Sequence, residues 1–188
     1  YNADACTINA YFGIDGVKPF LNYKEKGIFV LVKTSNPSSS DFQNLFSSKI
    51  SGISEEISEY EVSNQILKRN YILMAELVKE WASDLQKFSN FTNLGVVVGA
   101  TYPNELKMIR EVVKNSFFLI PGYGAQGAQA QDIKYGFYEN GLGGIVNSSR
   151  GIIYAYSKSK KYSQHDYTKA AKEVIVDMNK KINKEIGI

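Results

Sequence analysis

The sequence predicts an α/β fold of the (β/α)-barrel type, in which a parallel sheet is surrounded by helices. Five short, largely apolar segments each end in or near a turn signal, which is typical of buried parallel strands. The stretches between them carry helical patterns, and this alternation favours a parallel sheet with helices outside it. Two successive glycine-punctuated loops follow the last two strands, where (β/α) barrels typically bind phosphate. The predicted strands are residues 5–10, 28–34, 95–100, 117–120 and 144–147.

The first half of the chain has room for two helices and a surface loop. Residues 15–21 can hold a short helix after the first strand. The segment 43–61 is polar, and we expect it to be an excursion on the surface. Residues 63–88 carry apolar side chains at mostly three- and four-residue spacing, which predicts a long helix. Trp81 and this apolar stripe are expected to pack against the sheet.

Two later helices are indicated by the residues at their ends. Pro103 stands where the first turn of a helix would begin, and an apolar stripe follows from Leu106 to Val113. The last helix is expected over residues 167–186, with Asp166 as its N-cap and Gly187 at its end.

Composition narrows the classes of function. The chain has 188 residues, of which 44% are hydrophobic and 22% are charged, and a single domain over 1–188 is the simplest organisation. The net charge of +3 is too weak to predict nucleic-acid binding, but it is compatible with a phosphorylated substrate. No apolar run approaches the ~20 residues that a membrane helix needs, so no membrane association is expected.

The cysteine and histidine content predicts neither a disulfide nor a metal site. Cys6 is the only cysteine, which fits a reducing compartment, and we expect a cytoplasmic location. Because Cys6 falls on a predicted buried strand, it is expected to be a small core residue. His165 has no second histidine or nearby cysteine with which to bind a metal.

The two glycine-rich loops have the residue types of an anion site. The first is PGYGAQG at 121–127, and the second is NSSRG at 147–151. Glycines allow sharp turns that expose backbone N–H groups. Arg150 adds a guanidinium that can donate two hydrogen bonds to phosphate oxygens, and Gln126 adds a neutral N–H donor. A surface salt bridge is the alternative role for Arg150.

Five ordered motifs at the predicted strand ends resemble one enzyme family. They are DACTINAYFG (4–13), LVKTSNP (31–37), GVVVGATYP (95–103), PGYGAQG and NSSRG. Together they are similar to the C-terminal five-eighths of orotidine 5′-phosphate decarboxylases, in the longer-chain branch of bacteria and protozoan parasites. The resemblance implies a (β/α)8 TIM barrel with strands four to eight in this chain. The first three β/α units, on the order of 100 residues, would precede Tyr1.

The resemblance also implies roles for individual residues. Gln126 and Arg150 would hold the 5′-phosphate of the substrate. Ser35 would hydrogen-bond the pyrimidine, although it could instead be a turn serine before Asn36-Pro37. The remaining substrate-binding positions implied by the resemblance are Thr34 (supporting the base loop), Pro121 (near the base), and Gly122, Gly124, Ser149 and Gly151 (around the phosphate).

The family's acid–base centre is not found among these residues. In the family, a Lys flanked by carboxylates stabilises and protonates the carbanion left by loss of CO₂. It belongs to an Asp-x-Lys-x-x-Asp motif, one Asp of which reaches across a dimer interface. The nearest match is Asp132-Ile133-Lys134, but Phe137 replaces the second Asp and the segment is expected on a helix. We therefore expect no catalytic residue in this chain, which alone would be inactive.

The resemblance implies that the parent enzyme is a homodimer without metal or organic cofactor. It would convert orotidine 5′-phosphate to uridine 5′-phosphate in pyrimidine biosynthesis. Two other classes of function remain open. One is a non-catalytic phosphate- or nucleotide-binding fragment or paralogue. The other is a sugar-phosphate decarboxylase or isomerase on the same barrel, which the LVKTSNP motif disfavours.

Overall fold

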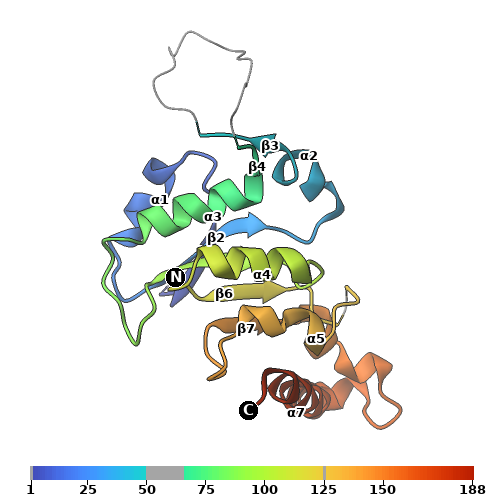
Figure 1. The fold of residues 1–188 in the computed structure, drawn as a ribbon. Coiled ribbons are helices and arrows are strands. Elements are labelled where there is room, and N and C mark those ends of the chain that lie inside the picture. The colour runs from blue at the N-terminus through green and yellow to red at the C-terminus, as the bar shows by residue number, and fades with distance from the viewer. Residues whose placement is uncertain (1, 50–65, 125) are drawn as a thin grey trace.

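The computed structural model describes residues 2–49, 66–124 and 126–188 (Figure 1). Most of the predicted polar excursion at 43–61 and the predicted helix start at Ser63 lie outside these residues, as does Ala125 in the first glycine-rich loop.

A five-stranded parallel sheet forms the centre of the fold. Its order is β1-β2-β5-β6-β7, so each of these strands lies beside the next one along the chain. All five strands predicted from the sequence are confirmed, with ends shifted by at most two residues. Their bounds are β1 Ala5–Ile8, β2 Gly27–Lys33, β5 Leu94–Val98, β6 Phe118–Pro121 and β7 Gly144–Asn147.

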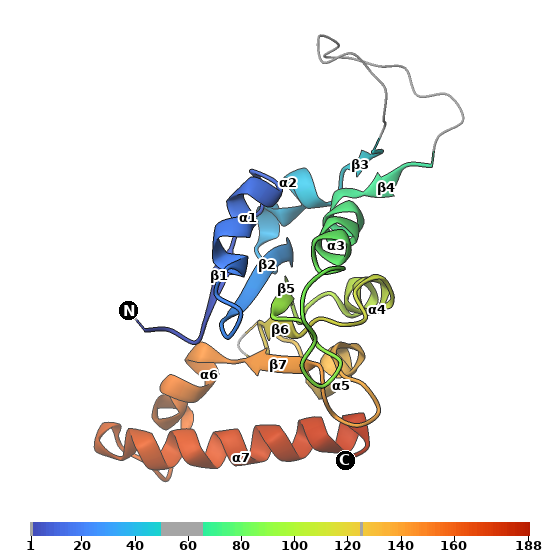
Figure 2. The same ribbon diagram turned by 90° about the vertical axis from the view of Figure 1, so that its left-hand side faces the viewer.

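Helices connect the strands and pack along the sheet, as Figure 2 shows for α1, α3, α4 and α5. The short helix α1, the helix starting at Pro103 and the last helix are confirmed, and Gly187 ends the last helix in the left-handed conformation. The α-helices are α1 Ile14–Leu21, α2 Ser40–Gln43, α3 Asn70–Trp81, α4 Pro103–Val112, α5 Ala130–Ile133, α6 Ser149–Ile153 and α7 Tyr167–Ile186. Short 3-10 turns are η1 Pro37–Ser39, η2 Lys134–Gly136, η3 Ala155–Lys158 and η4 Gln164–Asp166.

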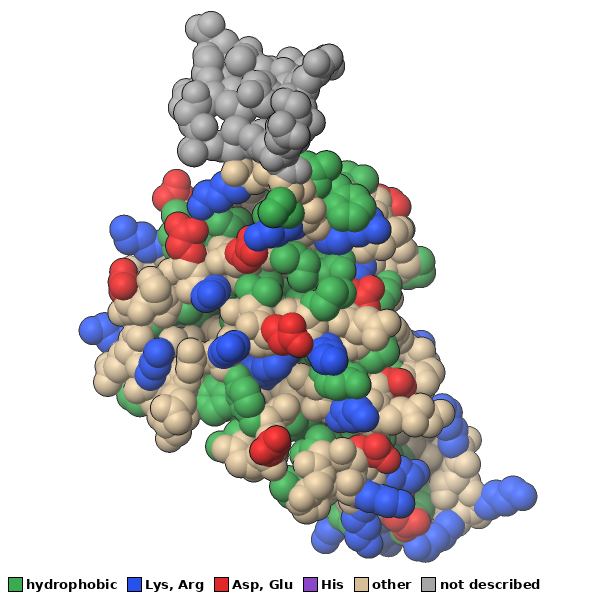
Figure 3. All heavy atoms as spheres, viewed as in Figure 1, with side chains coloured by type: hydrophobic (Ala, Val, Ile, Leu, Met, Phe, Trp, Pro, Cys, Tyr) green, Lys and Arg blue, Asp and Glu red, His purple; other side chains and the backbone are tan. Residues whose placement is uncertain are grey.

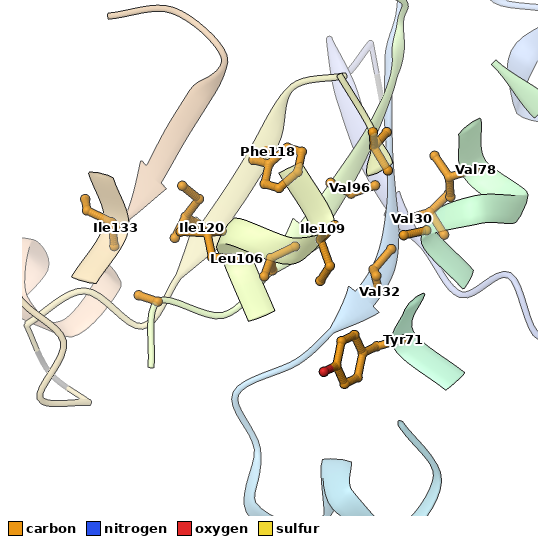
Figure 4. Packing of buried hydrophobic residues seen from close by; sticks show 14 of the residues in the cluster. Val30, Val32, Tyr71, Val78, Val96, Leu106, Ile109, Phe118, Ile120 and Ile133 are labelled. Atoms are coloured by element: carbon orange, nitrogen blue, oxygen red, sulfur yellow. The ribbon is translucent and has the colours of Figure 1, made fainter. Parts of the chain in front are cut away.

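The hydrophobic core lies between the sheet and these helices. Alternate residues of β2, including Val30 and Val32, face the helices because successive strand side chains point to opposite faces. Val96 and Phe118 continue the same layer on β5 and β6 (Figure 4). Figure 4 also shows Tyr71, from the first turn of α3, beside the end of β2.

The two outermost strands of the sheet, β1 and β7, are more exposed than predicted, since all five strands were expected to be buried. Cys6 on β1 is exposed rather than a core residue, and Ile145 on β7 is 46% exposed. Among the described residues, each of these strands pairs with a single neighbour in the sheet, so its other side is not covered by a further strand.

The long helix predicted over 63–88 is shorter in the structure. Lys68 and Arg69 form the strand β4, which pairs antiparallel with β3 (Phe46–Ser47), and α3 begins only at Asn70. Backbone pairing with β3 therefore overrides the apolar spacing at this end. Asp166 stands at the N-cap position of α7 as predicted, but its carboxylate accepts hydrogen bonds from the Ser163 hydroxyl and the Lys169 ammonium instead of capping the helix.

The surface carries both signs of charge. Acidic and basic side chains are interspersed on the face in Figure 3, with basic ones gathering toward the α7 end. Among the described helices, none combines the length and the apolar character needed to cross a membrane.

Candidate functional site

Hydrogen bonds tie the carboxyl ends of three neighbouring strands together. The Gly99 N–H donates to Lys33 O (2.8 Å), which joins the ends of β5 and β2. The Ala100 N–H donates to Pro121 O (2.8 Å), which joins the ends of β5 and β6. Because the strands are parallel, the loops that follow them meet at this one edge of the sheet, where α/β proteins bind ligands.

A pocket of about 120 Å³ lies between the loops that follow β6 and β7. Five of the predicted substrate-binding residues line it, and Gly124 and Gly151 directly follow the lining residues Tyr123 and Arg150. The lining residues are Pro121, Gly122, Tyr123, Gln126, Asn147, Ser148, Ser149 and Arg150.

Glycine is required where Gln126 folds back over the first loop. Gly122 has φ 101° and Gly124 has φ 73°, both in the left-handed region that favours glycine. A Cβ on Gly122 would lie 2.6 Å from Oε1 of Gln126. The side-chain amide of Gln126 can therefore approach the loop backbone only because residue 122 has no side chain.

Ser148 joins the two loops, a role that the residue pattern did not predict. Its buried hydroxyl donates to Tyr123 O at 3.0 Å. A Cβ on Gly151 would lie 2.6 Å from this hydroxyl oxygen, so the glycine leaves the space that Ser148 occupies. The signal in the sequence is weak, because a serine three residues before a glycine has many possible roles.

Arg150 has the freedom to bind an anion. It is exposed and lines the pocket, and within the described residues it forms no ion pair. The alternative role as a surface salt bridge is thus not seen in this part of the chain. Burial raises the pKa of the Tyr123 hydroxyl. Two charges on α7 have smaller effects on this pKa: Lys181 lowers it and Asp177 raises it.

Thr34 and Ser35 lie at the same edge of the sheet but outside this pocket. The Thr34 hydroxyl accepts from Gln43 Nε2 (2.8 Å) and donates to Asn36 Oδ1 (2.6 Å), so it is engaged within its own loop. Ser35 is half-buried against the end of β5, where a Cβ on Gly99 would meet the Ser35 Cβ at 2.9 Å. The absence of a side chain at Gly99 lets this loop approach β5.

The Asp132-Ile133-Lys134 segment has a structural role. Asp132 accepts a hydrogen bond from the Gln129 N–H at 2.7 Å and forms a capping box at the start of α5. This agrees with its expected helical location. Within the described residues, no group of three or more His, Cys, Asp or Glu side chains is arranged to hold a metal ion.

Comparison with known proteins identifies the family. The family model described as "Orotidine 5'-phosphate decarboxylase / HUMPS family" matches residues 1–165. The chain belongs to this family. The resemblance noted in the sequence is therefore confirmed, and the parallel sheet with outer helices is the corresponding part of the family's TIM barrel.

Individual members of the family agree with this assignment. Orotidine 5'-phosphate decarboxylase of Caldicellulosiruptor bescii is 43% identical over 190 residues, covering 100% of this chain and 55% of that protein. The corresponding protein of Petrotoga mobilis is 37% identical, covering 100% of this chain and 60% of its own length. This chain thus spans a little over half the length of these relatives.

Solved structures of the family have the same arrangement. The structure of Leishmania donovani UMP synthase matches with a TM-score of 0.66 and 32% identity, over 95% of this chain and 33% of that one. Leishmania donovani OMP decarboxylase matches with a TM-score of 0.66 and 30% identity, over 95% of this chain and 57% of that one.

Proposed function

We propose that the protein carrying this sequence decarboxylates orotidine 5′-phosphate to uridine 5′-phosphate in pyrimidine biosynthesis. In this proposal, the chain supplies the phosphate- and pyrimidine-binding loops. The observation that carries it is the pocket between the loops after β6 and β7, which Gln126 and Arg150 both line and whose first loop contains the left-handed glycines Gly122 and Gly124. A guanidinium and an amide that converge on a small pocket are suited to phosphate oxygens.

Phosphate binding in this pocket would contribute to the reaction although it is remote from the bond that breaks. Binding energy from a non-reacting part of a substrate can be used to position and distort the reacting part. The remaining proposed site residues are Thr34, Ser35, Pro121, Gly122, Gly124, Ser149 and Gly151, with Ser35 reading the base.

The catalytic lysine would come from outside these residues. We infer that β1, β2, β5, β6 and β7 correspond to strands four to eight of the barrel. Three earlier β/α units, on the order of 100 residues, would carry the Asp-x-Lys-x-x-Asp motif. The exposed edges at Cys6 and Ile145 support this reading, because a closed barrel has no edges. The chain would then be part of one barrel domain, inactive by itself.

The complete enzyme would be a cytoplasmic homodimer that uses no metal or organic cofactor. The family resemblance supports the dimer through the aspartate that one subunit lends to the other. Light scattering on the purified protein would measure its mass in solution. A monomer that decarboxylates its substrate at full rate would contradict the dimer.

The first test is an intact mass together with a decarboxylation assay on the same sample. A species heavier than this chain by roughly three β/α units, with turnover, would support the proposal. A mass equal to this chain, with uridine 5′-phosphate binding and no turnover, would indicate a non-catalytic binding module. Preference for a sugar phosphate over uridine 5′-phosphate in competition would indicate another phosphate-binding barrel.

The second test removes the proposed phosphate cation. Arg150→Ala is expected to weaken uridine 5′-phosphate binding by about tenfold or more, since a hydrogen bond to a charged group contributes about 1.5–3 kcal/mol. Calorimetric titration measures this change. Lys172→Ala on α7 removes the same charge from an exposed position outside the pocket, and it should leave the affinity unchanged. Equal affinities for the Arg150→Ala variant and the unaltered protein would exclude this role.

A further inference from the structure

Lys33 is a buried lysine without an ion-pair partner among the described residues. Its side chain is 0% exposed at the end of β2, and it is absent from the six ion pairs found there. Its ammonium donates one hydrogen bond to the Ser39 hydroxyl, at 3.1 Å. Lysines are almost never fully buried unless they are paired, because removing a charge from water is costly. A lysine in this position is therefore expected to have a role that offsets the free-energy cost of burying its charge.

A β-bulge aims this side chain into the helix layer. Leu31 pairs with Val97, but Lys33 pairs with Val98, so one extra residue is inserted in β2. Val98 belongs to the core between sheet and helices. Bulges commonly redirect a side chain in this way, and they are frequent beside functional sites.

Two tyrosine rings surround the ammonium. Nζ of Lys33 lies 4.2 Å from the centre of the Tyr102 ring and 6.0 Å from that of Tyr71. Tyr102 immediately precedes α4, and Tyr71 belongs to the first turn of α3. Cation–π attraction to these rings offsets part of the cost of burial.

The Lys33–Ser39 hydrogen bond closes the loop that carries Ser35. The loop leaves β2 at Lys33 and returns to it at Ser39, which is itself buried. The Ser39 hydroxyl also lies 3.4 Å from the Tyr102 hydroxyl, which ties the loop to the start of α4. On the other side, Ser35 rests against Gly99. The backbone around Ser35 is therefore fixed at both ends.

We propose that Lys33 is a positioning residue that holds the loop 34–39 in the conformation in which Ser35 meets the pyrimidine base. This inference rests on the proposed function. Lys33 does not contact the substrate; it acts through Ser39 and Tyr102. Its loss would affect recognition of the base while leaving the phosphate pocket, which other loops form, intact.

The test compares two ligands that share the ribose phosphate. Dissociation constants for uridine 5′-phosphate and ribose 5-phosphate are measured by calorimetry on the intact protein. The dissociation constant for ribose 5-phosphate divided by that for uridine 5′-phosphate reports the contribution of the base. In Lys33→Met this ratio is expected to fall about tenfold, equivalent to one hydrogen bond to the base. Affinity for ribose 5-phosphate should stay within about twofold, below the effect of one such bond.

Two further variants keep the test decisive. Ser39→Ala removes the acceptor but leaves the lysine, and it should lower the same ratio even if Lys33→Met does not fold. Lys24→Met changes an exposed lysine, and its ratio should match that of the unaltered protein.

The outcomes separate this inference from the proposed function. If the unaltered protein prefers uridine 5′-phosphate but Lys33→Met and Ser39→Ala keep the full ratio, only the positioning role is overturned. Equal loss for both ligands would also overturn it, because a general structural role predicts that result. If the unaltered protein shows no preference for uridine 5′-phosphate, both the inference and the proposed function fail.

Discussion

Arg110 is a buried cation whose partners are carbonyl oxygens rather than carboxylates. Its guanidinium donates to Ser116 O (2.8 Å), Gly136 O (2.6 Å) and Gly143 O (2.8 Å), and it lies 3.6 Å above the centre of the Phe118 ring. Burial lowers the pKa of Arg110 to about 10, so the group is still charged at neutral pH. One side chain thereby joins α4 to η2 and to the two segments that lead into β6 and β7.

Removing this cation should destabilise the protein strongly. Arg110→Met is expected to lower the free energy of unfolding by about 3 kcal/mol or more, because several buried carbonyls lose their donor at once. Urea titration followed by circular dichroism measures the change. Lys107→Met on the exposed side of the same helix serves as the control, with an effect within about 0.5 kcal/mol. Similar values for both variants would show that the carbonyl contacts contribute little.

Replacing Gly151 should change the affinity for the ligand more than it changes the free energy of unfolding. In Gly151→Ala the new Cβ would displace the Ser148 hydroxyl and break its bond to Tyr123 O. A hydroxyl can rotate, so stability should change by less than about 1 kcal/mol. Uridine 5′-phosphate affinity should fall because the two loops are no longer joined.

Thermal unfolding and calorimetric titration check the two parts of this prediction. Ser148→Ala should weaken binding to the same extent, and the double variant should lose no more than either single one. Additive losses would mean that Gly151 acts independently of Ser148.

Residue types and spacing predicted much of the candidate pocket but not its internal bonds. Gln126 and Arg150 could be named because few side chains suit phosphate and both lie in glycine-containing loops that follow a strand. Ser148 could not, since its role depends on where the carbonyl of Tyr123 lies in space. The burial of Lys33 could not be predicted from the sequence either, because the bulge that turns its side chain inward depends on pairing with β5.

At the scale of elements, α7 is attached to the preceding segment through Glu173. Its carboxylate accepts from Lys161 Nζ (2.8 Å) and the Tyr162 hydroxyl (2.6 Å). These two hydrogen bonds hold the pKa of Glu173 below its usual value. The same contact raises the pKa of Lys161. Residues 159–162 are thus linked to the middle of the helix at its exposed surface.

Because of these hydrogen bonds, the contribution of Glu173 to the free energy of unfolding is larger at neutral pH than at acidic pH. Because the pKa of Glu173 is lower in the folded state, its contribution is present above the ordinary glutamate pKa and is lost as the pH falls through the folded value. The stability difference between the unaltered protein and Glu173→Gln should therefore be larger at pH 7 than at pH 3. Urea midpoints at the two pH values measure it, with Glu185→Gln on the same helix as control. A difference that does not change with pH would contradict the link.

Apolar runs predicted the strands well because each one is short and is bounded by turn residues. The same reasoning failed for the start of α3, where Lys68 and Arg69 pair with β3. Helical spacing within a segment cannot reveal that a distant strand competes for its backbone. Exposure at β1 and β7 was also mispredicted, since burial of an edge strand depends on neighbours that the local sequence does not describe.

At the scale of the whole molecule, the sheet has two edges in a family whose fold is a barrel. The two edge strands, β1 and β7, would each gain a neighbour if the proposed first three units complete the barrel. We expect this chain to fold stably only together with those units, because edge strands with exposed apolar residues are prone to association. Denaturant titration of the isolated chain is the measurement; a soluble, monomeric chain that unfolds cooperatively would contradict this expectation.

The exposed thiol on β1 gives the protein its own chemical reporter of barrel closure. Cys6 lies opposite Ile28, a core residue on the helix side of β2. A neighbouring unit on that edge would cover the thiol. Alkylation should then be fast on the isolated chain and slow on the complete protein, returning to the fast rate in denaturant. Because Cys6 is the only cysteine in this sequence, one mass increment on the isolated chain, or on the Cys6 peptide of the complete protein, counts the chains in which that edge is open.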